Sequence, residues 1–370
     1  MKMFLSLVIW VGVLQFFKVE AAAVKSGLAC AMRSLCNGQT VEEHEQLPET
    51  RLIAIGDIHG SFTGLLEDLY DANITTSRDI CMWQSQPIHT ILVQSGDLVD
   101  RGPGALESLK CLQNLQNTAK DFNGEVVRIL GNHEIWWLEG YLNYKHKADT
   151  RKKIREFVDS LKEDILSQKV VGAYLHYVNN VPIIFNHAGY NKAFLEKLKS
   201  NDLLNKYRPE TIVNVTNQDL INTIIACKKA STCKLSGSYY EAGPERGGRG
   251  VGGPYWTDFS VLQREVKGNP HSNDFIQIVG HSMADCYRQY DTPSSFQQCP
   301  EGLIRATKDL SAFAVDGGMY LGGRGFLEIG SDGHFRSHEK LGKEKRVVDF
   351  TQSKCSAQCS DSNHKAEGEL

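Results

Sequence analysis

Hydrophobic positions in the first half of the chain alternate between short continuous runs and segments of helical spacing. The runs Leu52 to Ile55, Ile91 to Val93 and Val126 to Leu130 are rich in Val, Ile and Leu, as buried strands usually are. Between them, Ser61 to Leu69 and Gly104 to Leu115 carry apolar side chains on one helical face. The pattern predicts a repeat of strand, loop and helix, which is typical of an α/β fold.

A short polar cluster follows each of these runs directly: Gly56 to Gly60, Gly96 to Gly102 and Gly131 to Glu134. In repeated strand, loop and helix units, the loops after successive strands gather at one edge of the sheet. Residues far apart in the sequence are therefore expected to share one pocket. The side chains expected in it are Asp57, His59, Asp97, Asn132 and His133.

Two further histidines follow predicted strands later in the chain. Tyr174 to Val178 and Val181 to Phe185 predict a hairpin, and His187 comes just after its second strand. Phe275 to Val279 predicts another buried strand, and His281 follows it. Both histidines are expected to join the pocket.

The remaining patterns predict helices, closing strands and a tail. Helical spacing extends over Lys152 to Ile165 and over most of Ala193 to Cys227. The aromatic residues after the third polar cluster, Trp136 among them, are assigned to the core, and a charged tail is expected near Lys340. Three short runs predict the closing strands of a second sheet: Ile304 to Thr307, Ala312 to Val315 and Phe326 to Ile329.

Composition changes this picture little. The chain has 370 residues, 41% hydrophobic and 23% charged, which is enough apolar material for a large core. A formal net charge of -3 gives no indication of nucleic acid or an anionic membrane as a partner. The sequence leaves the oligomeric state open.

The first residues have the features of a secretory signal peptide. Lys2 is followed by an apolar run from Met3 to Phe17 and by small residues at Ala21 to Ala23. The run is short for a membrane span, so we expect cleavage and a protein that is secreted or lies in the lumen of the secretory pathway. The predicted segments are a signal peptide (1–22), a cysteine-containing extension (23–48), a main domain (49–338) and a charged tail (339–370).

Ten cysteines, an even number, favour disulfides in an exported chain. Four close pairs suggest local bridges and leave Cys81 and Cys111, but the connectivity stays open. The close pairs are Cys30 with Cys36, Cys227 with Cys233, Cys286 with Cys299, and Cys355 with Cys359. A zinc site is the alternative, but the paired spacing of zinc modules is missing. Glycosylation sequons at Asn73 and Asn214 fit the same compartment and predict exposed positions.

The strand ends offer carboxylate, amide and imidazole ligands without a thiolate. Such a set suits Mn, Fe or Zn and exceeds the needs of one ion. Asp97 can bridge two divalent or trivalent ions that bind a phosphoryl group and activate a water. Arg101 has a planar fork that suits phosphate oxygens, and His133, held by Asp100, can protonate a leaving oxygen. A lone histidine would usually be an ordinary side chain, but glycine-flanked strand ends jointly favour the metal site.

A glycine-rich loop from Ser236 to Gly253 contains Arg246 and Arg249. It lacks the Lys-Ser or Lys-Thr pair of a P-loop and the spacing of a dinucleotide-binding loop. A mobile rim is therefore favoured over a phosphate cradle.

The three polar clusters, GDIHG, GDLVDRG and GNHE, resemble the signature of metallophosphoesterases in the form found in phosphoprotein phosphatases. The resemblance continues through His187 and His281 to about Ile329. It implies a calcineurin-like fold, in which two packed mixed β-sheets are flanked by helices. It implies one metal held by Asp57, His59 and Asp97, and another held by Asp97, Asn132, His187 and His281. It also implies substrate contacts from Arg101, Asn132 and His133, with His133 and Asp100 serving the leaving group.

Where the chain differs from the eukaryotic Ser/Thr phosphatases, it resembles the Shewanella-like branch of the family. Leu130 precedes the third block and Ala188 follows the third metal histidine, where those enzymes have Arg and Gly. Met283 stands where nucleotidases and sphingomyelinases have a histidine ligand, which disfavours those activities. Arg246 and Arg249 are candidates for a second phosphate-binding arginine.

The sequence thus predicts a secreted dinuclear-metal phosphatase that hydrolyses phosphomonoesters by direct attack of a metal-bound hydroxide. The favoured substrate is a phosphorylated protein, with phosphotyrosine and phosphoserine or phosphothreonine not distinguished, or else a small phosphoester. The alternative enzyme is a dinucleotide-polyphosphate hydrolase, whose third block ends in Asp where this chain has Glu134. The alternative of another class is a non-catalytic phosphate-binding protein, which is disfavoured because every metal and acid position is present.

Overall fold

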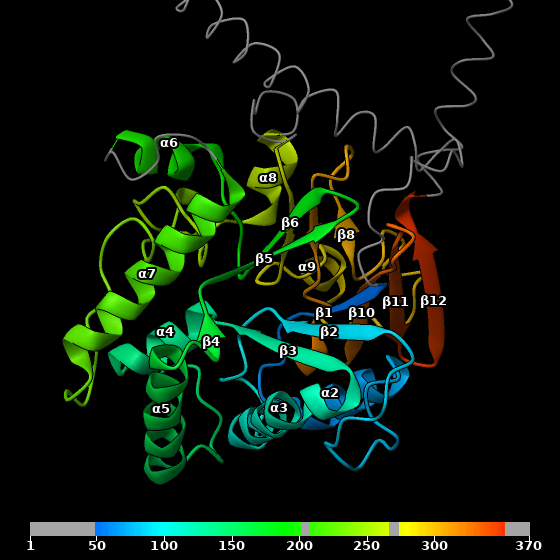
Figure 1. Cartoon of the computed structure of the whole chain (residues 1–370), viewed down its shortest axis with the longest axis horizontal. Helices are drawn as coiled ribbons and strands as arrows, with labels where there is room; N and C mark the ends of the chain where they lie inside the picture. The colour runs from blue at the N-terminus through cyan, green and yellow to red at the C-terminus, as the bar shows by residue number, and fades with distance from the viewer. Residues whose placement is uncertain (1–48, 201–207, 266–273, 352–370) are drawn as a thin grey trace, which may run out of the picture.

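The computed structural model describes residues 49–200, 208–265 and 274–351. Within these ranges, two mixed β-sheets pack against each other and helices flank them (Figure 1). The predicted fold class, α/β with two packed mixed sheets, is confirmed.

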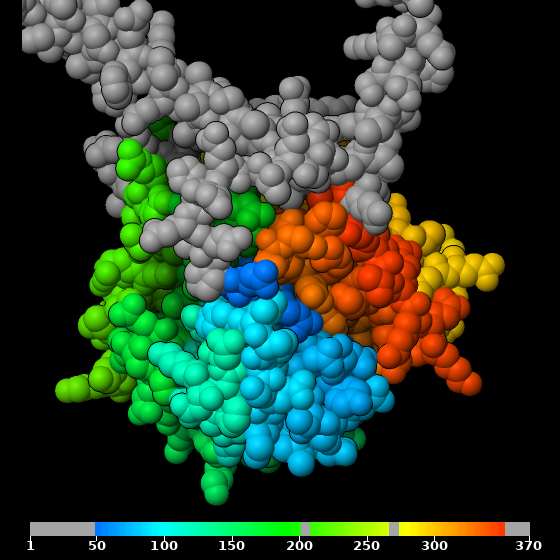
Figure 2. All heavy atoms as spheres, turned by 45° about the vertical axis from the view of Figure 1, so that its right-hand side comes forward, coloured from blue at the N-terminus to red at the C-terminus, as the bar shows by residue number. Residues whose placement is uncertain are grey.

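The first sheet has seven strands in the order β12-β11-β10-β1-β2-β3-β4. Its parallel strands are β1 (Thr50–Ile55), β2 (His89–Gln94), β3 (Gly124–Ile129) and β4 (Val170–Val171). Its antiparallel strands are β10 (Gly323–Ile329), β11 (Phe335–Leu341) and β12 (Glu344–Asp349). Because β1 lies between β2 and β10, the blue start of the described chain lies between cyan and orange segments in Figure 2.

The second sheet has five strands in the order β5-β6-β7-β9-β8. The strands are β5 (Ala173–Val178), β6 (Val181–Asn186), β7 (Ile276–Val279), β8 (Arg305–Ala306) and β9 (Ala312–Ala314). The predicted hairpin is β5 with β6, and its turn residues Asn179 and Asn180 have φ angles of 49° and 63°. Asn tolerates this left-handed conformation better than most residues, which explains why the chain turns there.

Helices follow the strands as the spacing predicted. Those of the first half are α2 (Phe62–Asp71), α3 (Ala105–Thr118), α4 (Asn132–Glu139) and α5 (Arg151–Leu166). Those of the second half are α6 (Lys192–Ser200), α7 (Pro209–Cys227), α8 (Phe259–Glu265) and α9 (Cys286–Tyr290). Short 3-10 turns are η1 (Ala119–Phe122), η2 (Pro244–Arg246) and η3 (Met319–Leu321). Pro209 opens α7, where a proline costs no hydrogen bond.

Alternation along β1 divides the core into two layers. Leu52 and Ala54 join the apolar cluster between the sheets, together with Phe185 and Ile278 of the second sheet. Neighbouring residues on β1, such as Ile53, face the opposite way and pack with the side chains of α2 and α3. Burial on both faces holds the parallel strands in a single register, and this register fixes where their ends lie.

Two sequence-based expectations are wrong at the C-terminal end. Phe326 to Ile329 does not close the second sheet: it belongs to β10 and pairs with β1 in the first. The main domain does not end at 338, because β11 and β12 continue the first sheet to Asp349. Along β11 buried and half-buried positions alternate, so Arg336, His338 and Lys340 lie on the half-buried face and Glu339 lies on the buried one.

Three disulfides lie in the described residues: Cys81–Cys111, Cys227–Cys233 and Cys286–Cys299. The other predicted pairs and the predicted signal peptide lie outside the described residues. Asn73 and Asn214 of the two sequons are exposed, as predicted. Among the described residues, no helix combines the length and the apolar character needed to cross a membrane.

Candidate active site

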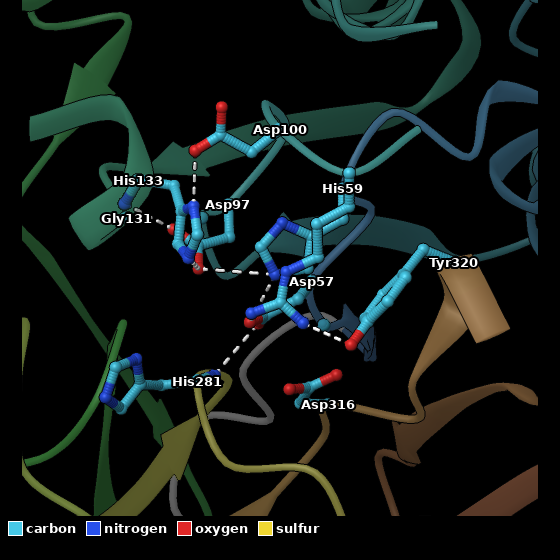
Figure 3. A network of polar contacts seen from close by, with 12 residues as sticks. Asp57, His59, Asp97, Asp100, Gly131, His133, His281, Asp316 and Tyr320 are labelled. Carbon is cyan, nitrogen blue, oxygen red and sulfur yellow. Dashed lines mark hydrogen bonds and ion pairs between the residues drawn. The ribbon is translucent and has the colours of Figure 1, made fainter. Parts of the chain in front are cut away.

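The strand ends bring the predicted side chains of both sheets to one place. Asp57, His59, Asp97 and His133 come from the first sheet and point towards one another, and His281 approaches from the second (Figure 3). Asn132 opens α4 after β3, and His187 follows β6. The structure therefore gathers every residue that the sequence placed in a metal site.

One group of donors is centred on His59. Its Nδ1 lies 2.9 Å from the Val99 carbonyl oxygen and donates to it. Burial lowers the pKa of His59 well below its usual value, so the ring is neutral and Nε2 carries a lone pair. That lone pair faces carboxylate oxygens of Asp97 at 3.6 Å and Asp57 at 3.9 Å. A cation bound between this imidazole nitrogen and the two carboxylates would be coordinated by all three groups.

A second group is centred on His187 and Asn132. The His187 Nδ1 donates to the Ser95 carbonyl oxygen at 2.7 Å, and burial lowers the pKa of this imidazole. Its unprotonated Nε2 then faces the Asn132 Oδ1 at 2.8 Å, so that two acceptors oppose each other. The His281 Nδ1 lies 2.9 Å from the same oxygen, and its buried Nε2 has no hydrogen-bond partner among the described residues. The donor chemistry therefore fits a second cation.

The carboxylates show the same need for positive charge. Burial and the negative charges of Asp316 and Asp97 raise the pKa of Asp57 well above its usual value. Burial also opposes ionisation of Asp97, the carboxylate at the centre of the site. Cations between these groups would favour the ionised form of both carboxylates.

The backbone around the site is held in conformations that L-residues rarely adopt. Positive φ angles occur at His59 (47°), Asp97 (56°), Asp100 (69°), Arg101 (64°) and His281 (64°). Such conformations cost free energy and cluster where function requires a fixed side-chain direction.

Glu134 stabilises the turn after β2. Its carboxylate accepts hydrogen bonds from the backbone N–H groups of Asp97, Leu98 and Gly131, at 2.7 to 2.9 Å. A Cβ atom at Gly131 would collide with the Asp97 Oδ1, so only glycine fits beside the central carboxylate. The last residue of the third polar cluster thus positions the second cluster.

His133 and Asp100 form a tightly bonded pair. The His133 Nδ1 lies 2.6 Å from the Asp100 Oδ2, and both residues are buried. Burial alone would lower the pKa of His133, but the charges of Asp97 and Asp100 and the hydrogen bond to Asp100 raise it. The ring is therefore able to carry a proton near neutral pH, with its Nε2 3.9 Å from the Asp97 Oδ2.

A cavity of about 370 Å³ opens onto this site, lined by His59, Asp97, Asn132, His133 and His281. Arg101 also lines it, and its guanidinium lies 4.5 Å from the centre of the Tyr320 ring and donates to the Tyr320 hydroxyl. Arg246 faces the cavity as well, paired with Asp258 at 3.0 Å and bonded to the Ser282 hydroxyl at 2.7 Å. Of the two candidate arginines in the glycine-rich loop, Arg246 lines the cavity and Arg249 does not.

Sequence reasoning missed several residues that line the cavity. The assignment of Trp136 to the core is wrong, because its ring lines the cavity 4.6 Å from that of His133 and 5.2 Å from that of Tyr144. The other missed residues are Tyr144, Trp256, Ala284, Tyr287, Arg288, Asp316, Tyr320 and Leu321. A signal for Asp316 was present, because it is the second residue after β9 and is followed by glycine, just as Asp57 is the second residue after β1 and lies in a glycine-containing turn. Burial raises the pKa of Asp316 to about 6.

A model of the calcineurin-like phosphoesterase family matches residues 50–281, more than half of the chain. The chain belongs to this family. The matched part of the phosphoesterase contains all of the strand ends that converge in the cavity except the one before Asp316.

Two relatives in the same family match part of the phosphoesterase. Shewanella-like protein phosphatase 1 of Plasmodium berghei is 34% identical over 43% of this chain and 44% of its own length. A symmetrical bis(5'-nucleosyl)-tetraphosphatase of Methylobacillus flagellatus is 31% identical over 37% of this chain and 42% of its own length. The phosphoesterase thus aligns with less than half of the length of each of these curated relatives.

A solved structure, the cold-active protein-tyrosine phosphatase of a psychrophilic Shewanella species, shares the fold. It has a TM-score of 0.52 at 18% identity and covers 82% of each chain. The predicted family is confirmed, and the relatives named Shewanella-like support the predicted branch.

Proposed function

We propose that this phosphoesterase is a dinuclear-metal phosphatase that acts on phosphorylated proteins. The observation that carries the proposal is the set of opposed acceptors around Asp97 and Asn132, beside an arginine and a His–Asp pair. Asp57, His59 and Asp97 would hold one ion, and Asp97, Asn132, His187 and His281 the other. When bound, the two ions would supply Lewis acids for the phosphoryl oxygens and an activated water.

The residues of the chain have separate tasks in this proposal. Arg101 binds a phosphate oxygen through its fork and is preset by its contact with Tyr320. Arg246 also lines the cavity and adds a second positive charge there. His133 holds a proton at Nε2 and delivers it to the leaving oxygen, while Asp100 keeps the ring in that orientation.

The walls of the cavity support an aryl phosphate as the preferred substrate. Trp136 stacks on Tyr144 with rings 5.2 Å apart and 19° from parallel, and Trp256 packs against Trp136 at 5.2 Å. Aromatic side chains beside the proton donor favour contact with a phenyl ring over a short aliphatic side chain. The Shewanella neighbour is named a protein-tyrosine phosphatase, and we propose phosphotyrosine as the preferred substrate here too.

We also propose that the protein acts in an oxidising compartment, outside the cell or in the secretory pathway. The three disulfides support this, since such bonds persist there. The apolar run at residues 3–17 gives independent support as a leader.

A substrate panel on the full chain tests the proposal. Metal-stripped protein receives Mn, Fe or Zn and is assayed on phosphotyrosine and phosphothreonine peptides, a phosphodiester and diadenosine tetraphosphate. We expect metal-dependent release of phosphate, fastest from the phosphotyrosine peptide and reduced at least about 1,000-fold in D97N. Faster cleavage of diadenosine tetraphosphate would favour the tetraphosphatase alternative, and no turnover of any substrate would favour a binding protein.

A further inference from the structure

Asp100, the carboxylate beside His133, is fixed from two sides. Its Oδ2 lies 2.6 Å from the His133 Nδ1, and its Oδ1 accepts a hydrogen bond of 2.7 Å from the indole Nε1 of Trp137. Asp100 is 1% exposed and Trp137 is 3% exposed, so water cannot readily replace either partner.

The helix α4 explains why both donors reach one carboxylate. His133 and Trp137 are four residues apart in α4 and therefore lie on the same face. The Trp137 ring also packs edge-on against Phe157 of α5, with centroids 5.3 Å apart, which restricts the indole. Because an indole N–H can only donate, it occupies Oδ1 and leaves Oδ2 to accept from His133.

The direction of the carboxylate decides the direction of the imidazole. With Oδ2 held against Nδ1, the other nitrogen of His133 faces the cavity. Without the indole, Oδ1 would be buried without a donor, and Asp100 would be free to turn towards other N–H groups. The ring of His133 would then lose a fixed orientation.

We propose that Trp137 is a positioning residue for proton transfer to the leaving oxygen, an inference that rests on the proposed function. As the bond from phosphorus to the leaving oxygen breaks, its electron pair stays on that oxygen, and the proton passes to it from the His133 Nε2. Trp137 acts only through Asp100, whereas its neighbour Trp136 lines the cavity itself.

The test compares two substrates that differ in their need for a proton. Phenyl phosphate releases a strongly basic phenolate, and 2,4-dinitrophenyl phosphate releases an anion that needs no protonation. We expect W137F to lower kcat for phenyl phosphate by about 10- to 100-fold and to change kcat for the dinitrophenyl ester by less than about 3-fold. Equal losses on both esters, or no loss on either, would overturn the proposal.

Trp83 offers a matched control. It is 2% exposed, and its Nε1 has no hydrogen-bond partner among the described residues, so W83F removes an equal volume without a bond. We expect W83F to show no difference between the two esters. A wild-type protein that hydrolyses neither ester would instead contradict the proposed function.

A spectroscopic readout needs neither activity nor a folded W137F. In metal-stripped protein labelled with ¹⁵N-tryptophan, the Nε1–H resonance of Trp137 should lie downfield because its acceptor is a buried carboxylate. D100N should move this resonance upfield and leave that of Trp83 unchanged. An unmoved Trp137 resonance would overturn the proposal.

Discussion

Arg101 is oriented before any substrate arrives. Its backbone has a φ angle of 64°, its guanidinium lies over the Tyr320 ring at 4.5 Å, and it donates to the Tyr320 hydroxyl. An arginine fixed in this way loses little side-chain freedom when it binds phosphate. We therefore expect its planar fork, and not only its charge, to contribute to catalysis.

R101K keeps the charge but removes the fork and most of the stacking. We expect kcat/KM for a phosphotyrosine peptide to fall by about 10- to 100-fold, because a lysine cannot bind two phosphate oxygens in one plane. Steady-state kinetics of the metal-loaded protein measures this loss. The control is R78K, since Arg78 stacks on Tyr70 at 4.8 Å but does not line the cavity. A loss below 2-fold in R101K, or an equal loss in R78K, would contradict the role of Arg101.

The place of a single residue in the site was predictable where that residue belongs to a short motif. Asp57, Asp97 and Asn132 follow buried strands and adjoin glycines, so the order of the strands was enough to predict that they lie together. Trp136 was not predictable, because helical spacing does not reveal whether an aromatic side chain faces the core or a cavity. The position of the Trp136 ring depends on contacts with Tyr144, in the loop after α4, and with Trp256, which is distant from both in the sequence.

The strands β1, β10 and β11 are linked by a polar cluster on the face of the sheet. Arg51 of β1 donates from Nε and Nη2 to the two carboxylate oxygens of Glu328 in β10, at 3.1 and 3.2 Å. His338 of β11 lies 3.1 Å from one of these oxygens. Burial alone would raise the pKa of Glu328, but the hydrogen bonds from His338 and Arg51 outweigh it and lower the pKa to about 2.

This shift predicts a pH-dependent contribution to stability. Because the pKa of Glu328 is lower in the folded than in the unfolded chain, the ionised form stabilises the fold above the unfolded pKa of about 4.3. That stability is lost as the pH falls towards 2. We expect E328Q to lower the free energy of unfolding by about 1–3 kcal/mol at pH 7, and the difference to shrink below about pH 4.3.

Urea unfolding of wild type and E328Q between pH 7 and pH 3 measures this difference. R51K keeps a positive charge beside Glu328 but loses the two-pronged contact, so it should cost less than E328Q. A difference between wild type and E328Q that stays constant across this range would contradict the assignment of the ion pair.

Element types were easier to predict than element partners. The type of an element such as β1 or α2 depends on the spacing of its apolar residues, and that spacing can be read from a single stretch of sequence. The pairing partner of β10 depends on residues far away in the sequence. Its apolar side chains Leu327 and Ile329 would face the core between the sheets in either sheet, so the apolar pattern does not reveal which sheet β10 joins. For β12 the apolar signal is weak, because the strand lies at the sheet edge and no position along it is fully buried.

The candidate metal centre is shared between the two sheets. Asp57, His59, Asp97 and Asn132 follow strands of the first sheet, whereas His187 and His281 follow strands of the second. Any ion that binds both sets also links the sheets. Metal binding should therefore raise the thermal stability of the folded chain, because the ligands are dispersed in the unfolded chain.

The central claim is that two metal ions bind on either side of Asp97. It is tested most directly by measuring the number of metal ions bound per chain. Stripped full-length protein is equilibrated with Mn, Fe or Zn, freed of excess ion, and measured by elemental analysis and thermal unfolding. The control D68N replaces a buried aspartate outside the cavity. We predict about two ions per chain and a raised Tm for wild type and D68N, and at most about one ion with little rise in Tm for D97N. No ion retained by the wild type, or two retained by D97N, would contradict the account.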